Sequence, residues 1–218
     1  MARAKAVSCP ICEKRKPERF CPAKGEKICA VCCGREREVT ISCTPDCAYL
    51  LAAHRYEQKH PRRVPADTPL LDEQFSSDIV HTRQPLLAGM AFAVAKFASA
   101  QSQMSDPDVL AAIQALAETY RTLSTGIYYE KPPDSPAPRG LYAELAQFLA
   151  EARRTPGQHP ASVPVKDSDI FALLVFLYRM GLFHSNGRPR SRRFIEFLRG
   201  QFPQAPELRR EESRIIVP

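Results

Sequence analysis

The sequence predicts a mainly α-helical protein, in which a small cysteine-rich module that binds two zinc ions precedes an all-α helical domain. All eight cysteines lie between Cys9 and Cys47. Apolar residues after residue 84 recur at helical spacing, and the 20 prolines mark the breaks between segments. We expect the zinc module at residues 1–60, a linker and lead-in at 61–84, the helical domain at 85–202 and a flexible tail at 203–218.

The cysteines have the spacing of metal ligands: two Cys-x2-Cys pairs, a Cys-x3-Cys pair and two further cysteines. Two residues between ligands let a tight turn present both sulfurs to one ion, and structural zinc takes four ligands in a tetrahedron. Eight ligands predict two four-cysteine sites and two zinc ions. The expected ligands are Cys9, Cys12, Cys21, Cys29, Cys32, Cys33, Cys43 and Cys47.

An interleaved pairing is favoured because the adjacent Cys32 and Cys33 should point towards different ions. One ion would be bound by Cys9, Cys12, Cys29 and Cys32, and the other by Cys21, Cys33, Cys43 and Cys47. A sequential pairing, with the first four cysteines on one ion, and an exchange of Cys32 with Cys33 remain alternatives. An iron–sulfur cluster and disulfides are further alternatives for the same residues.

Local chemistry predicts the backbone around the ligands. The two Cys-x2-Cys pairs are expected as tight turns. Thr44 and Pro45, inside the Cys-x3-Cys pair, indicate a helix that starts there and ends before Pro61. His54 lies two turns along that helix, about 10 Å from its start, and is not expected to bind metal.

The motifs Arg19-Phe20-Cys21-Pro22, Ile28-Cys29-x2-Cys32 and Cys43-x3-Cys47 before an apolar helix resemble the HIT-type zinc fingers. The related MYND-like and B-box fingers share the same cross-brace logic. The resemblance covers residues 9–56. It departs from the family where Ala23 and Lys24 replace an expected second ligand, and where Cys43 replaces a frequent histidine. The resemblance implies an interaction module and not an enzyme.

Charge distinguishes the two halves of the chain. Residues 1–63 carry 14 Lys and Arg against 7 Asp and Glu, whereas residues 64–218 carry 17 of each. Eight thiolates and two zinc ions would lower the module's charge to about +3. This favours a protein partner and an adaptor function. A nucleic-acid-binding or transcription-regulatory protein is the alternative, and a thiol redox or metal sensor a weaker one.

An arginine cluster at a helix start is the candidate site outside the module. It comprises Arg188, Arg190, Arg192 and Arg193, and would bind an anion or an acidic partner surface. A solvated charged surface is the alternative.

The helical domain is expected to contain four or five helices. One runs from residue 85 to 103, and a second follows a Ser105 cap. Others cover residues 141–152 and 170–177, the latter apolar on all sides and therefore central. Gly181 is expected to end that helix, and Ser191 to cap the last one.

The helical domain carries no recognised catalytic motif. It has no Gly-rich phosphate loop, no His-Glu metal pair and no Gly-x-Ser-x-Gly elbow. We therefore expect no enzymatic activity. The most apolar run, residues 170–177, is far shorter than the roughly 20 residues of a membrane span. With no signal-type sequence before Cys9, we expect a cytoplasmic protein without membrane contact.

Overall fold

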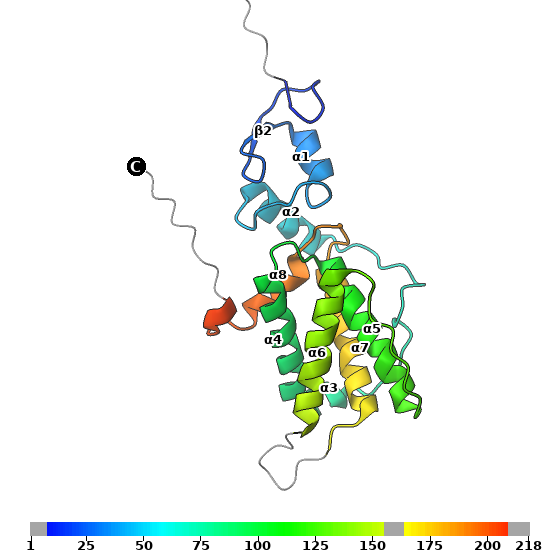
Figure 1. Cartoon of the computed structure of the whole chain (residues 1–218). Helices are drawn as coiled ribbons and strands as arrows, with labels where there is room; N and C mark the ends of the chain where they lie inside the picture. The colour runs from blue at the N-terminus through cyan, green and yellow to red at the C-terminus, as the bar shows by residue number, and fades with distance from the viewer. Residues whose placement is uncertain (1–7, 155–163, 209–218) are drawn as a thin grey trace, which may run out of the picture. The chain divides into compact units, whose positions relative to one another are not determined.

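Eight α-helices and a two-stranded sheet form the structure of residues 8–154 and 164–208, the part of the chain that this computed structural model describes (Figure 1). The chain divides into two compact units. The first contains residues up to Arg63 together with Asn186–Ser191, and the second contains Val64–Ser185 and the residues from Arg192 onward. Among the described helices, none combines the length and apolar character needed to cross a bilayer.

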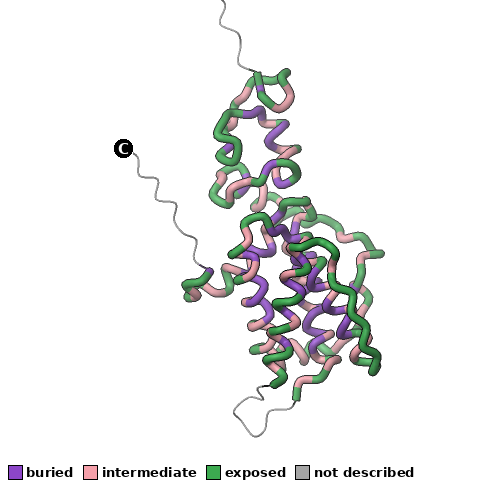
Figure 2. Tube along the Cα trace, viewed as in Figure 1, coloured by how far each residue is buried: buried purple, intermediate pink, exposed green. Residues whose placement is uncertain are grey.

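The first unit is built around short elements: β1 (Arg19–Cys21), β2 (Glu26–Ile28), α1 (Ala30–Glu36) and α2 (Ala48–Lys59). The strands pair antiparallel around a turn in which Gly25 has a φ of +67°. The hydrophobic core of this unit consists of Ile28, Ile41 and cysteines. Figure 2 shows how few residues of this unit are buried. A core this small does not stabilise a fold by itself, and cross-linking by metal usually supplies the rest.

The second unit is entirely helical. Its elements are α3 (Asp78–Thr82), α4 (Gln84–Ala100), α5 (Asp106–Ser124), α6 (Pro136–Arg154), α7 (Asp167–His184), α8 (Arg193–Gly200) and the 3-10 turn η1 (Pro206–Leu208). Helix α5 packs on α6 and α7, and α4 packs on α6 and α8. Helix α7 is buried along most of its length, which confirms the prediction that this apolar segment is central. The mainly α fold class is likewise confirmed.

Helix α7 does not end at Gly181, and that prediction was wrong. The helix continues to His184. A Cβ atom on Gly181 would lie 2.7 Å from Leu110 Cδ2 and 2.9 Å from Phe194 Cε1. The glycine therefore lets α7 approach the side chains of α5 and α8 closely, and it is not a stop signal.

Two helix starts follow proline and capping rules. Helix α5 begins after Ser105, as predicted, and Asp108 Oδ2 accepts hydrogen bonds from the Ser105 N–H at 2.9 Å and from its hydroxyl at 2.7 Å. Helix α6 begins at Pro136, before the start predicted at residue 141. Prolines in a first helical turn lose no backbone hydrogen bond, so they start this helix instead of excluding it.

The N-cap residue of α8 is Arg192 and not Ser191 as expected, and a distant carboxylate binds the first turn of the helix. The buried carboxylate of Asp106 accepts hydrogen bonds from the N–H groups of Phe194 at 3.1 Å and Ile195 at 3.2 Å. The first residue of α5 thus supplies the acceptors for the first turn of α8. Carboxylates are favoured there because the N–H groups of a helix start carry partial positive charge.

Residues on both sides of the predicted helical domain pack into the second unit. In the lead-in, Leu70 is buried, and the Arg179 guanidinium donates to the carbonyls of Leu70, Leu71 and Glu73. In the expected tail, Leu208 is buried, and its carbonyl accepts a 2.7 Å hydrogen bond from Arg199. The rest of the expected tail, residues 209–218, lies outside the described residues.

Candidate metal centre

Four cysteine sulfurs of the first unit lie close together. The Sγ atoms of Cys9, Cys12, Cys29 and Cys32 all lie within 4.8 Å of one another. The Sγ atoms of Cys12 and Cys29 are 3.9 Å apart. A zinc tetrahedron with bonds of about 2.3 Å has sulfur–sulfur edges of about 3.8 Å. The cluster can therefore hold a metal ion such as zinc.

The two ligand pairs are presented by different local structures. A tight turn presents Cys9 and Cys12, closed by a 2.7 Å hydrogen bond from the Glu13 N–H to the Cys9 carbonyl. Cys29 is the N-cap of α1, and its sulfur accepts a 3.3 Å hydrogen bond from the Cys32 N–H. A helix start therefore replaces the turn expected at this second pair. The positive end of the helix favours thiolates there.

The thiols of this cluster differ in acidity. Hydrogen bonding from the Lys14 backbone N–H lowers the pKa of Cys12 to about 6. Burial raises the pKa of Cys32 to about 12, and the neighbouring sulfurs of Cys29 and Cys12 add to this effect. The first negative charge forms easily, whereas the last proton is held tightly because the last thiol is buried and its charge would lie close to the others. A bound divalent cation would remove that repulsion and displace the protons.

The remaining four cysteines, Cys21, Cys33, Cys43 and Cys47, are more dispersed. Within residues 8–154 and 164–208, the structure brings no second group of three or more potential ligands equally close together. Burial raises the pKa of Cys43 to about 11, and the charges of Glu38, Cys47 and Cys21 act in the same direction. The thiols of Cys21, Cys43 and Cys47 are thus close enough for their charges to interact. Cys32, and not Cys21, completes the first group, as in the interleaved pairing.

The last cysteine pair precedes a helix instead of starting it. Helix α2 begins at Ala48 with Cys47 as its N-cap, and the Cys47 N–H donates to the Thr44 carbonyl at 3.1 Å. Thr44 and Pro45 therefore form a turn and not the helix start predicted for them. His54, on α2, places its Nε2 3.1 Å from a carboxylate oxygen of Glu38.

Glu38 is a buried carboxylate that the sequence did not identify. Only 3% of the residue is exposed, and its φ is +54°. Its carboxylate oxygens accept hydrogen bonds from His54 and, at 2.8 Å, from Asn186 Nδ2. Glu38 is the last of four consecutive charged residues, which begin at Arg35. Nothing in their sequence indicates that Glu38 is the buried one.

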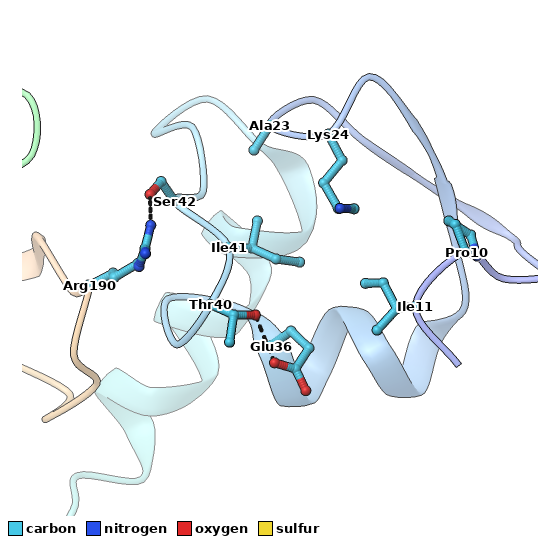
Figure 3. A pocket seen from close by; sticks show the side chains of 9 residues that line it. All are labelled: Pro10, Ile11, Ala23, Lys24, Glu36, Thr40, Ile41, Ser42 and Arg190. Atoms are coloured by element: carbon cyan, nitrogen blue, oxygen red, sulfur yellow. Dashed lines mark hydrogen bonds between the residues drawn. The ribbon is translucent and has the colours of Figure 1, made fainter. Parts of the chain in front are cut away.

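The predicted arginine cluster makes hydrogen bonds within its own chain. Arg188 donates to the carbonyls of Gly34 at 3.2 Å and Arg37 at 2.5 Å, at the C-terminal end of α1. Arg190 donates to Ser42 Oγ at 2.5 Å (Figure 3).

The last two arginines of the cluster belong to the second unit. Arg192 donates to four carbonyls at the end of α4 and in the loop after it, those of Ala98, Gln101, Ser102 and Met104. Arg193 is half-buried, and its charge reaches His184. Arginines at helix C-termini satisfy carbonyls that lack helical partners. Arg188 and Arg192 therefore act as C-terminal caps.

Comparison of the chain with protein-family models, with curated proteins and with solved structures finds no match. The chain is a mainly helical protein whose N-terminal cysteine-rich unit contains a four-cysteine cluster that can hold a metal ion.

Proposed function

We propose that this protein is a zinc-binding adaptor, in which a structural zinc module and the helical unit mediate contacts with other proteins. The observation that carries the proposal is the four-sulfur cluster. Four thiolates fill a zinc tetrahedron, and a catalytic site would keep one position for water or substrate. Burial of Cys9, Cys29 and Cys32 is also typical of a structural site.

A second zinc ion on Cys21, Cys33, Cys43 and Cys47 is part of the proposal. Cys32 and Cys33 are neighbours on α1, and adjacent helical residues point about 100° apart, which favours separate ions. The electrostatic coupling of Cys43 to Cys21 and Cys47 supports the same grouping. Two ions bound in this way would cross-link β1, β2, α1 and α2, the short elements of the first unit.

Exposed apolar side chains support a role in protein contacts. In the described part of the first unit, 53% of Phe20 and 64% of Tyr56 are exposed. Other large apolar residues exposed there are Val31, Val39, Tyr49 and Leu51. Aromatic residues are enriched at protein interfaces, and a metal-held scaffold presents them without the entropy cost of ordering a loop.

Metal analysis tests the zinc content directly. We expect two zinc ions per chain in protein purified without added metal, and one ion in each of the variants Cys12→Ser and Cys47→Ser, because each loses one of the two sites. One ion in the wild-type protein, retained in Cys47→Ser, would limit the proposal to the first site. Iron in place of zinc would contradict it.

The adaptor role is tested by capture from an extract of the native cells. We expect a partner bound by the zinc-loaded wild-type protein to be lost in a Phe20→Ser, Leu51→Ser double variant. It should be retained in the control variant Ile127→Ser, which changes an exposed apolar residue of the second unit. Capture that survives both the double variant and zinc removal would contradict a role for the module.

Nucleic-acid binding is the second candidate. The observation favouring it is that Lys14, Arg15 and Lys16 are all exposed beside the first metal site. Binding through phosphates would weaken steeply as salt concentration rises. A mobility-shift titration at low and physiological salt, with a Lys14→Glu, Lys16→Glu variant, tests it. Absence of any shift at low salt excludes this candidate.

A further inference from the structure

The first unit contains a cavity of about 540 Å³. Its lining includes Ile11, Lys24, Glu36, Thr40, Ile41 and Arg190. Figure 3 shows the side chains of Ile11, Ile41 and Lys24 directed into the same space. Neither the metal cluster nor the proposed second site uses these side chains.

The base of the cavity is apolar and is held by the metal-binding segments. Ile41 is 7% exposed, and Ile11 is half-buried. Ile11 lies between Cys9 and Cys12, and the loop that carries Ile41 ends at Cys43. Metal bound at either position would therefore fix the residue that forms the base.

Two cationic residues, Lys24 and Arg190, line the cavity. The backbone N–H of Arg190 donates to the Glu38 carbonyl at 2.9 Å. This hydrogen bond holds the backbone of Arg190 beside the cavity. Lys24 Nζ lies 3.6 Å from a carboxylate oxygen of Glu26, with more than a third of each side chain exposed. An ion pair this exposed contributes little, so a ligand carboxylate can replace Glu26 as the partner of Lys24.

Glu36 gives the cavity one acceptor. Its Oε2 accepts a 2.7 Å hydrogen bond from the Thr40 hydroxyl, which orients the carboxylate (Figure 3). The lining thus combines an apolar base, two cations and one oriented carboxylate. A ligand that matches it has an aliphatic group, a negative charge and an N–H donor.

We infer that this cavity binds a peptide segment of a partner protein in which an acidic residue stands next to an aliphatic one. The aliphatic side chain packs on Ile11 and Ile41, the carboxylate pairs with Lys24 or Arg190, and a main-chain N–H donates to Glu36. The inference rests on the proposed adaptor function and names the chemistry of its partner.

The openness of the cavity favours a peptide over a small molecule. Its volume lies within the range of about 300–1,000 Å³ that is usual for ligand sites, which enclose about 70–90% of a small ligand. Here the polar lining residues Lys24, Thr40 and Ser42 are exposed. Because its polar side is open, the cavity would leave much of a small molecule exposed. It can still enclose one side chain of a larger partner.

The test is an NMR titration of the full, zinc-loaded chain with isoleucine methyl labels. The probe is the blocked pentapeptide Ala-Glu-Leu-Glu-Ala. We expect saturable shifts at Ile11 and Ile41, and binding about tenfold weaker in Lys24→Glu, equivalent to one charge-assisted hydrogen bond. The matched control is Lys27→Glu, which changes an exposed lysine of the same hairpin outside the lining and should bind as the wild type does.

Three outcomes would overturn the inference. A control peptide with lysine in place of both glutamates could bind as tightly as the probe, or Lys24→Glu and Lys27→Glu could weaken binding equally. Isovalerate could also bind as tightly as the peptide. Failure of the adaptor role has a different signature. Peptide binding that fails while partner capture still depends on Phe20 and Leu51 refutes only the cavity inference. Peptide binding that persists while capture is insensitive to those residues refutes the adaptor surface.

Discussion

The side-chain amide of Asn186 donates a 2.8 Å hydrogen bond to the carboxylate of Glu38, although 148 positions separate the two residues in the chain. The same amide lies 3.2 Å from a carboxylate oxygen of Glu57. One neutral side chain thus separates two acidic ones inside the first unit. The contact is part of the attachment of residues 186–191, which Arg188 and Arg190 complete.

Replacement of Asn186 tests this attachment. Asn186→Ala should lower the stability of this attachment by about 1–2 kcal/mol, because the buried Glu38 carboxylate loses a hydrogen-bond donor. Asn186→Asp should cost more, since a third carboxylate then faces Glu38 and Glu57. The measurement is hydrogen exchange of the Arg190 amide, which donates to the Glu38 carbonyl. Equal exchange in both variants would show that charge at this position is unimportant.

Metal removal should unfold the first unit selectively. A chelator at neutral pH should abolish the dispersed NMR signals of residues 8–63, because few apolar residues are buried there. Most of the far-ultraviolet circular dichroism should remain, since the second unit contains six of the eight described helices and the larger core. Loss of both signals together would mean that the second unit depends on metal.

Gly181→Ala should destabilise the second unit by about 1–3 kcal/mol, although alanine is the better helix former. The added methyl group would lie 2.7 Å from Leu110 and 2.9 Å from the fully buried Phe194. Gly200→Ala is the matched control, because a Cβ at this helical glycine meets no atom within 4 Å. Chemical denaturation provides the measurement, and equal stability of the two variants would contradict the packing role of Gly181.

His184 should make the second unit less stable at acid pH. Burial lowers the pKa of His184, and the charge of Arg193 lowers it further, while the ring stacks on Phe197 at 3.6 Å between centroids. In the unfolded chain the histidine pKa is about 6.5, so below that pH the unfolded state binds more protons. Stability should therefore be constant above about pH 6.5 and fall as pH decreases through the window down to the folded pKa.

Thermal unfolding of His184→Gln at a series of pH values checks this prediction. The difference in melting temperature between wild type and variant should vary with pH below about 6.5. His81→Gln, which replaces an exposed histidine of α3, is the matched control. A pH-independent difference for His184→Gln would show that its protonation is not linked to folding.

Features encoded locally were predictable from sequence. The ligand pair at Cys9 and Cys12 follows from its spacing, and the start of α5 at Ser105 follows from the acidic residues and proline after it. Helical periodicity likewise identified α4, α5 and the central α7. Each of these signals lies within one or two turns of chain, where residue chemistry and backbone geometry determine each other directly.

Features that depend on distant partners were not predictable. The burial of Glu38 depends on His54 and on Asn186, which lies 148 positions away. The function of Gly181 depends on Leu110 and Phe194, and an isolated glycine near a helix end resembles a stop signal equally well. The arginine cluster has the composition of an anion site, but carbonyls elsewhere in the fold occupy much of its donor capacity.

The capping of α8 by Asp106 has a consequence for the order in which the chain folds. The acceptor lies 88 positions before the first N–H group it satisfies, and Arg192 provides no side-chain cap of its own. A nascent chain therefore has α5 available well before α8 emerges from the ribosome. We therefore expect α8 to complete the bundle last, because a fragment lacking α5 has no carboxylate at Asp106 to begin this helix.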